Sequence, residues 1–257
     1  MRTSIRNAAV AATAVSLALL ATACGGGESA DKGKDAGKGS AAPSASATSE
    51  APAAKALSDA ELEKLIVEKA DLKGYQVQKT EAGDVVPASE VVTEKASCAP
   101  IAHAMSFISP GSPAASAERQ VLAEPKKDAT ADPEEALLGA LGVEMSAVVL
   151  GSYDGQGAQE ALASVKKAGA ECADGFTVSH KSEKNKVLKV DTESFTAGED
   201  AASFTLTSDL EGERLISRLV VLRQGNTLAS FSTVSFAPGG VKEFPKALID
   251  AQVKKLG

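Results

Sequence analysis

The spacing of hydrophobic residues divides the chain into three parts. Residues 8–20 form a short apolar stretch, residues 25–55 contain no bulky apolar side chain, and regular hydrophobic spacing begins at Leu57. A segment without bulky apolar side chains cannot bury enough surface to offset the entropy lost on ordering. We therefore predict a leader at 1–23, a disordered linker at 24–56 and a folded domain at 57–257.

The folded domain is predicted to open with a helix. Ser58 followed by Glu61 is the pattern of a capping box, and Leu57 with Leu62 has the spacing of a hydrophobic staple. Leu62, Leu65, Ile66 and Ala70 then fall on one helical face. The next helix-ending residue is Gly74, so the sequence predicts a helix from the cap at Ser58 to Gly74.

After Gly74 the pattern favours strands that are interrupted by a few helices. The predicted strands are 75–77, 84–92, 118–123, 143–153, 176–180, 186–191, 202–208, 215–223 and 228–236. The predicted helices are 98–108, 136–141, 158–170 and 241–256. This order is typical of an α+β domain with two layers, in which helices pack on a mostly antiparallel sheet.

The first 24 residues have the features of an export signal. Arg2 and Arg6 precede the apolar stretch, which is shorter than the roughly 20 residues of a membrane span, and Cys24 follows three small residues. The segment resembles a bacterial lipoprotein signal, although Ala21 stands where that pattern usually has Leu. The resemblance implies that Cys24 carries diacylglycerol and becomes the mature N-terminus. The alternative is a secretory signal cleaved near Ala23, which leaves a free thiol.

The lipid anchor would place the domain on the extracytoplasmic face of the cell membrane. Two acyl chains, of the palmitate type, give stable attachment where a single chain holds only marginally. The linker would then act as a tether with a reach of roughly 30 Å. Its Ser-, Thr- and Pro-containing part, residues 40–52, is interpreted either as an unmodified spacer or as a carrier of sugars.

Composition and charge exclude several classes of protein. The chain has 257 residues, 27 Lys and Arg against 34 Asp and Glu, and a net charge of −7. Without Arg2 and Arg6 the balance is 25 − 34, or −9. Nucleic-acid-binding proteins concentrate positive charge, so no nucleic-acid partner is expected. The proportion of hydrophobic residues, 44%, is that of an ordinary globular protein.

The two remaining cysteines are predicted to form a disulfide. Once Cys24 is assigned to the lipid, Cys98 and Cys172 are left, and thiols outside the cytoplasm usually pair. A metal or redox pair is the alternative, but the chain lacks the Cys-x-x-Cys spacing that favours it. We therefore expect no metal site and a structural cross-link.

Catalytic chemistry has little support in the sequence. Only two histidines are present, and we interpret His103 as packed on a helix and His180 as solvated near a strand end. No Gly-x-Ser-x-Gly motif occurs. Gly155-Gln156-Gly157 lacks the third glycine of a dinucleotide loop, because Glu160 stands at that position. We therefore expect no nucleotide or other cofactor. We interpret Asp154 as lying near a helix cap.

Arginines near the end of the domain are the other candidate ligand-binding groups. Arg214, Arg218 and Arg223 share one predicted strand, and Arg223 would face the side opposite to the other two. An arginine in a cleft would hold an acidic ligand. Salt bridges to nearby glutamates are the expectation that we favour.

The domain also resembles the extracellular sensor-domain family found at the C-terminus of the mycobacterial membrane kinase PknH and in many actinobacterial lipoproteins. The resemblance rests on Cys98 at a helix start, the strand-to-helix run 148–168 before Cys172, the hairpin 218–231 with Gly225 at its turn, and the C-terminal helix. It implies a two-layer α+β fold with a cleft for an extracytoplasmic ligand. That family often has two disulfides and a Trp, whereas this chain has one candidate pair and no Trp.

These features together predict a membrane-anchored extracytoplasmic lipoprotein that is not an enzyme. Its partners would be the membrane, through the lipid on Cys24, and an unidentified ligand or protein of the cell envelope. Two alternatives stay open. The domain could carry lipid or another apolar envelope component, which requires a large apolar cavity, or it could be an enzyme whose site has no recognisable motif.

Overall fold

The computed structural model describes residues 54–80, 86–124, 142–181 and 183–257. The predicted leader, Cys24 and nearly all of the predicted linker lie outside these residues, as does the helix predicted at 136–141. Described structure therefore begins three residues before Leu57, where the sequence predicted that the domain starts.

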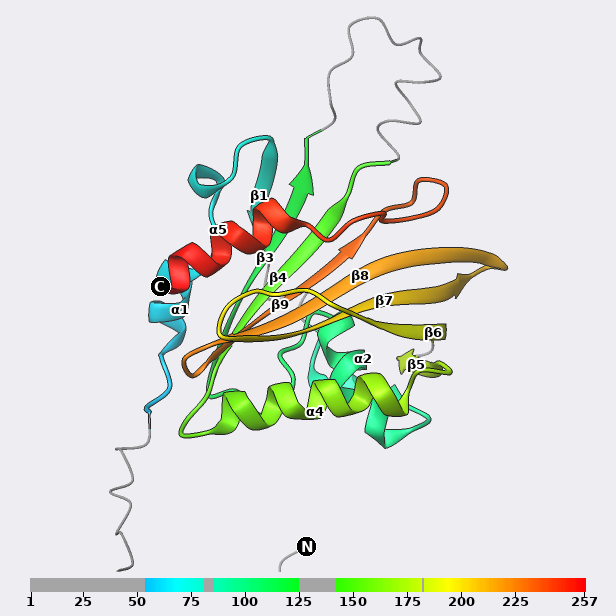
Figure 1. Cartoon of the computed structure of the whole chain (residues 1–257), viewed down its shortest axis with the longest axis horizontal. Coiled ribbons are helices and arrows are strands. Elements are labelled where there is room, and N and C mark those ends of the chain that lie inside the picture. The colour runs from blue at the N-terminus through cyan, green and yellow to red at the C-terminus, as the bar shows by residue number, and fades with distance from the viewer. Residues whose placement is uncertain (1–53, 81–85, 125–141, 182) are drawn as a thin grey trace, which may run out of the picture. The chain divides into compact units, whose positions relative to one another are not determined.

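The described residues form a nine-stranded antiparallel sheet (Figure 1). The strands are β1 (Tyr75–Lys79), β2 (Val91–Thr93), β3 (Ala115–Ala123), β4 (Met145–Ser152), β5 (Phe176–His180), β6 (Glu183–Glu193), β7 (Asp200–Leu210), β8 (Glu213–Gln224) and β9 (Thr227–Val234). They lie in the order β1-β3-β4-β9-β8-β7-β6-β5-β2, and each pair of neighbours is antiparallel. The predicted α+β class with a mostly antiparallel sheet is confirmed.

Four α-helices and three short 3-10 helices in the described residues accompany the sheet. The α-helices are α1 (Asp59–Leu65), α2 (Ala99–Met105), α4 (Gly157–Glu171) and α5 (Lys246–Leu256). The 3-10 helices are η1 (Lys69–Asp71), η2 (Ala88–Glu90) and η3 (Ala96–Cys98). Helix α4 matches its predicted range within one residue at each end, because its buried face of Ala161, Leu162, Val165 and Ala168 was regular in the sequence.

Helices cover both faces of the sheet, which strand β8 shows most directly. Leu219 and Val221 belong to a core with α2 and α4, whereas Val220 and Leu222 belong to a core with α1 and α5. Successive side chains of a strand point to opposite faces, so the two cores lie on opposite sides of β8. The helices expected in one layer are thus divided between the two faces.

Helix α1 ends nine residues earlier than predicted. It stops at Leu65, and Ile66 is already extended. The side chain of Gln252 on α5 accepts a hydrogen bond from the backbone N–H of Val67 and donates one to the carbonyl of Leu65. These bonds satisfy backbone groups that further helical turns would otherwise have satisfied, so a contact from the other end of the chain ends the helix.

Helix α5 begins five residues later than predicted. The backbone N–H of Val241 bonds to the carbonyl of Ile216 on β8, and Pro245 is the N-cap of the helix. Val241 is buried, as its place in the apolar pattern indicated, but it packs from a loop. The hydrophobic spacing alone could not distinguish these two ways of burying Val241.

Candidate functional site

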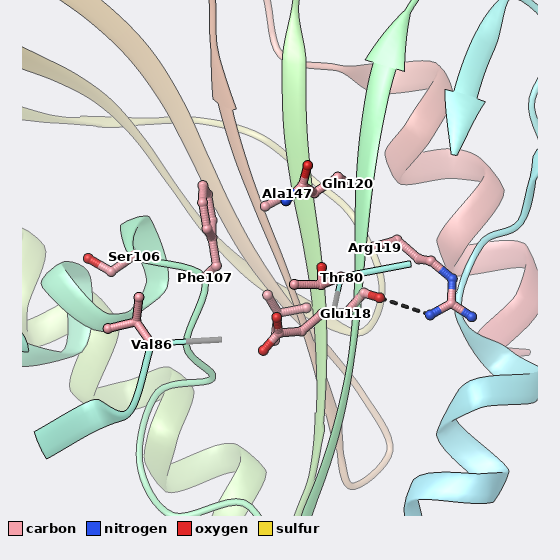
Figure 2. A pocket seen from close by; sticks show the side chains of 9 residues that line it. Thr80, Val86, Ser106, Phe107, Glu118, Arg119, Gln120 and Ala147 are labelled. Atoms are coloured by element: carbon pink, nitrogen blue, oxygen red, sulfur yellow. Dashed lines mark hydrogen bonds between the residues drawn. The ribbon is translucent and has the colours of Figure 1, made fainter. Parts of the chain in front are cut away.

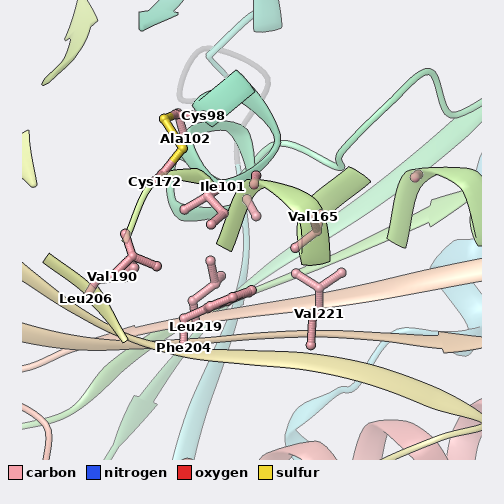
Figure 3. Packing of buried hydrophobic residues seen from close by; sticks show 14 of the residues in the cluster. Cys98, Ile101, Ala102, Val165, Cys172, Val190, Phe204, Leu206, Leu219 and Val221 are labelled. Carbon is pink, nitrogen blue, oxygen red and sulfur yellow. A yellow bond between two sulfur atoms is a disulfide. The ribbon is translucent and has the colours of Figure 1, made fainter. Parts of the chain in front are cut away.

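The predicted cysteine pair lies inside the core of the α2 and α4 face. Cys98 and Cys172 form a disulfide with a Cα–Cα distance of 5.9 Å, and both residues are fully buried. Figure 3 shows the bond beside the side chains of Ile101 and Ala102. The cross-link joins the start of α2 to the end of α4, so it holds α2 in place against the sheet.

A cleft of about 600 Å³ lies beside the C-terminal end of α2. Met105 and Ser106 form one wall, and residues at the ends of β5, β6 and β7 form the other. The ionisable groups along it are His180, Glu183, Lys184, Asp209 and Glu211. The carboxylates outnumber the lysine, so this larger cleft has a negative charge balance.

A second, smaller cleft of about 70 Å³ adjoins the loop that follows α2 and begins at Ser106. Ser106 lines both clefts, and Phe107 and Val86 stand beside it in the smaller one. Figure 2 shows these side chains across from Glu118 on β3 and Ala147 on β4. The loop that follows α2 therefore separates two adjoining hollows that are built from distant parts of the chain.

Glu118 is the acidic group of the smaller cleft. Its half-buried carboxylate lies on the side of β3 that faces Val86, and burial raises the pKa of this carboxyl above its ordinary value (Figure 2). Among the residues that the structure describes, no Lys, Arg or His pairs with it. Within the described residues, the charged form of Glu118 therefore has no ion-pair partner.

The neighbouring Arg119 does not serve as the partner of Glu118. Its guanidinium points away from the cleft, and Nη1 donates to the backbone carbonyl of Glu118 at 2.8 Å (Figure 2). Nη2 of the same group lies 2.8 Å from Glu63 Oε2 on α1. The hydrogen bond from Arg119 holds the pKa of Glu63 below its ordinary value. Adjacent residues of β3 point to opposite faces, so this half-buried ion pair belongs to the α1 face, whereas Glu118 faces the opposite side of the sheet.

Phe107 has an unusual backbone conformation at the mouth of the smaller cleft. Its φ is 64°, and 42% of the residue is exposed. The N–H of Ile108 bonds to the carbonyl of His103, which is the helix-ending arrangement that normally has glycine at the position of Phe107. A non-glycine residue in this region costs about 1–2 kcal/mol, so the rest of the structure holds this ring at the cleft against a local preference.

The two histidines have different surroundings. His103 is half-buried on α2, and desolvation by this burial lowers the pKa of its imidazole. The side chain of His180 is 35% exposed, with Nε2 lying 3.4 Å from Glu90 Oε2, at the rim of the larger cleft. The expectation that His180 is simply solvated is therefore wrong, because the strand end on which it lies folds against η2.

Two of the predicted arginines form ion pairs with glutamates, as the sequence analysis favoured. Arg223 Nη1 lies 2.6 Å from Glu199 Oε2, and Arg218 Nη1 lies 3.6 Å from Glu193 Oε1. Arg218 also stands 5.2 Å from the centre of the Phe244 ring. Both arginines therefore pair with glutamates within the domain.

Asp154 lies near the cap of α4, as predicted, and it also holds the segment that precedes the domain. Its carboxylate accepts a hydrogen bond from the backbone N–H of Ala56 at 2.9 Å, while Gln156 is the N-cap of α4. The side-chain amide of Asn226 donates to the carbonyl of Lys55 at 2.7 Å, and Gly155 N–H donates to the carbonyl of Ala54. The glycine-containing turn therefore binds the end of the linker segment.

Side chains of the types that bind metal ions are scattered over the described residues. In that part of the chain no group of three or more His, Cys, Asp or Glu side chains is arranged to hold a metal ion. None of the helices described there is both long enough and apolar enough to span a membrane.

Sequence reasoning missed Glu118 and Phe107 as site residues. Glu118 appeared only as the first residue of a predicted strand, and Phe107 as part of a helix expected to reach residue 108. An available signal was the run Phe107-Ile108-Ser109-Pro110, since a proline shortly after a helix often marks its end. Nothing in the spacing indicated that residues 107 and 118 share a cleft.

Comparison with known proteins gives a distant likeness in structure. No family model matches the chain, and no curated protein matches it. Among solved structures, the chain is similar to the crystal structure of the extracellular domain of PknH from Mycobacterium tuberculosis, with a TM-score of 0.44 and 11% sequence identity. The alignment covers 79% of this chain and 97% of that domain. The proposals made for this chain rest on its own residues.

Proposed function

We propose that the chain is a lipoprotein anchored at the extracytoplasmic face of the cell membrane, whose α+β domain binds a ligand without converting it. The observation that carries the proposal is the pair of clefts on either side of Ser106. Concave sites with a few convergent polar groups are the usual form of a ligand-binding site. The domain would act as a sensing or binding module of the cell envelope.

The disulfide supports both the location and the rigidity of this module. Disulfides persist in oxidising compartments outside the cytoplasm. The bond between Cys98 and Cys172 fixes α2, and the end of α2 forms one wall of each cleft. A wall that is fixed before binding lowers the entropic cost of binding.

The first described residues support the idea of a tether that ends at the domain. Backbone groups of Ala54, Lys55 and Ala56 are held by hydrogen bonds to the turns at Asp154 and Asn226. Leu57 N–H also donates to Ser152 Oγ at 2.8 Å. The end of a linker from Cys24 would thus be fixed to the folded domain by these hydrogen bonds.

The clefts favour a polar ligand over an apolar cargo. The larger cleft has Met105, Val178 and Leu210 as its large apolar residues, and its other lining residues are polar or charged. A carrier of lipid needs a mainly apolar cavity. In the described part of the chain, Nε2 of His180 has no hydrogen-bond partner, so this atom activates no serine, threonine or cysteine there.

Native mass spectrometry of the full chain extracted from its own envelope tests the proposal. We expect a bound mass that dissociates on activation and that is absent from Ser106→Trp, in which the indole obstructs the wall that both clefts share. Thr192→Trp, at an exposed position of β6 that lines neither cleft, is the matched control and should retain the mass. A chain that never carries a bound mass, or one that binds it equally in both variants, would contradict the proposal.

A further inference from the structure

We infer that the smaller cleft is a site for an organic ammonium group, with Glu118 as its counter-ion and the ring of Phe107 as its aromatic wall. The inference rests on the proposed function, since it names the chemical class of the ligand that the clefts bind. It concerns the cleft lined by Phe107, Glu118 and Gln120, together with Thr80 and Ser106.

The charge of this cleft comes from one side chain. Among the described residues that line the cleft, Glu118 is the ionisable group that faces the space, because Arg119 points away from it (Figure 2) and pairs with Glu63. A partly buried carboxylate without a cation is destabilised when it is ionised, and a bound cation removes that cost. An anionic ligand would meet like charge at this place, and a neutral ligand would leave Glu118 uncompensated.

Phe107 gives the cleft a second feature that suits an ammonium group. Its ring stands across the space from Glu118, at the end of α2, and is held there by a left-handed backbone that favours glycine (Figure 2). Cations are attracted to the face of an aromatic ring by its quadrupole. Backbone strain of this kind is retained where the surrounding structure fixes a side chain in place, and it often marks a functional position.

The smaller cleft has room for the head of an amine. Its volume of about 70 Å³ is several times the roughly 10–15 Å³ that a cavity needs to hold one water molecule. An ammonium with one or two methylene groups fills that space, and Ser106 and Gln120 offer oxygen acceptors for its N–H groups. The rest of such a ligand would extend past Ser106 into the larger cleft.

The negative charge balance of the larger cleft also favours a cationic ligand. Glu183, Asp209 and Glu211 line it, with Lys184 as the opposing charge. The two clefts together therefore present an excess of carboxylates. Such an excess attracts cationic ligands and accelerates their association.

NMR titration of the ¹⁵N-labelled full chain, purified in detergent, tests the inference. The ligands added are cadaverine, which is a free amine, and Nα-acetyl-lysine N-methylamide, which presents a lysine side chain. We expect saturable shifts of the backbone amides around Phe107 and Glu118 with at least one of them, and the tighter of the two identifies the source of the ammonium. Pentanol and hexanoate serve as the neutral and anionic comparisons and should give no saturable shift there.

Two variants separate the roles of the charge and the ring. Glu118→Gln keeps the shape of the side chain and should weaken amine binding about tenfold. Phe107→Leu should weaken it about two- to fivefold. Glu94→Gln removes the same charge from an exposed position away from both clefts and should bind as the unaltered chain does.

The inference is wrong if neither amine gives saturable shifts, if Glu118→Gln binds amines as tightly as the unaltered chain, or if hexanoate competes with them. This failure is distinguishable from a failure of the proposed function. A bound mass that is retained in native mass spectrometry while amines do not bind would leave the ligand-binding role in place and remove only the ammonium assignment.

Discussion

The side-chain oxygen Oε1 of Gln252 lies 2.9 Å from the backbone nitrogen of Val67. Gln252 is completely buried, and its amide nitrogen donates to the carbonyl of Leu65 on the same segment. One side chain therefore satisfies both a donor and an acceptor that the end of α1 leaves open. This contact ties the N-terminal helix to the C-terminal helix across 185 residues of sequence.

Replacing Gln252 by leucine should destabilise the domain. The substitution keeps most of the volume but leaves the N–H of Val67 and the carbonyl of Leu65 buried without partners, which costs about 1–3 kcal/mol for each such group. Urea unfolding followed by circular dichroism measures the free energy of unfolding. Lys254→Leu, at an exposed position of the same helix, is the control, and equal stability of the two variants would refute the assigned role.

Loss of the disulfide should also destabilise the domain. The bond closes a loop between residues 74 apart, and the chain-entropy model gives about 4 kcal/mol for a loop of that length. The double variant Cys98→Ala with Cys172→Ala should therefore unfold at lower urea concentration. Intact mass before and after reduction should differ by two hydrogens for this bond, and free thiols at both positions in exported protein would show that it does not form.

Glu118→Gln should make the domain more stable at neutral pH. Burial raises the pKa of Glu118 in the folded state above its value in the unfolded chain, so the ionised form opposes folding. At pH values below the pKa of Glu118 in the unfolded chain, the carboxyl is protonated in both the folded and the unfolded state, so the variant is no more stable than the unaltered domain. At pH values above the pKa of Glu118 in the folded domain, the variant has its full stability advantage. The stability difference should therefore shrink as pH falls through the folded pKa.

Urea unfolding at several pH values, with Glu94→Gln as the control, measures this dependence. Glu94 is exposed, so its variant should show no matching change with pH. A Glu118→Gln domain that is less stable than the unaltered one at neutral pH would mean that the carboxylate has a stabilising partner.

Asn226→Ala should loosen the attachment of the linker without unfolding the domain. The variant removes the hydrogen bond from the Asn226 amide to the carbonyl of Lys55, which is worth about 1 kcal/mol. Amide hydrogen exchange at Ala56 and Leu57 should become about fivefold faster, as expected for local opening of that free energy. Asn185→Ala, at an exposed site on β6, is the control and should leave this exchange rate unchanged. An unchanged exchange rate in Asn226→Ala would show that the contact with Lys55 does not hold the linker.

Cys24→Ala should release the protein from the membrane. The proposed anchor is two acyl chains on this residue, and their loss removes the attachment energy. Fractionation of cells that produce the unaltered chain or the variant measures the distribution between membrane and soluble fractions. Ser29→Ala is the matched control because it changes a nearby residue and leaves Cys24 in place. Identical partitioning of Cys24→Ala and the unaltered chain would exclude the lipid anchor.

Local patterns in the sequence were sufficient for most of the elements. Helix α4 was predicted almost to the residue because its apolar face repeats regularly between Ala158 and Ala168. The strands from β5 to β9 were predicted in order, since alternation along the strand and the turn at Gly225 are local signals. The pairing of Cys98 with Cys172 followed from the compartment and from there being only two candidates.

The tertiary structure decided where α1 and α5 begin and end, and it decided the site. The ends depend on Gln252 reaching Val67 and on Ile216 bonding to Val241, which are contacts between distant parts of the chain. The helices divide between both faces of the sheet because the strand order brings early and late segments together. The clefts depend on the same long-range folding, since Phe107 and Glu118 meet only when the end of α2 lies against β3 and β4. Hydrophobic spacing reports which side chains are buried, whereas the packing partner of each is set by the three-dimensional arrangement.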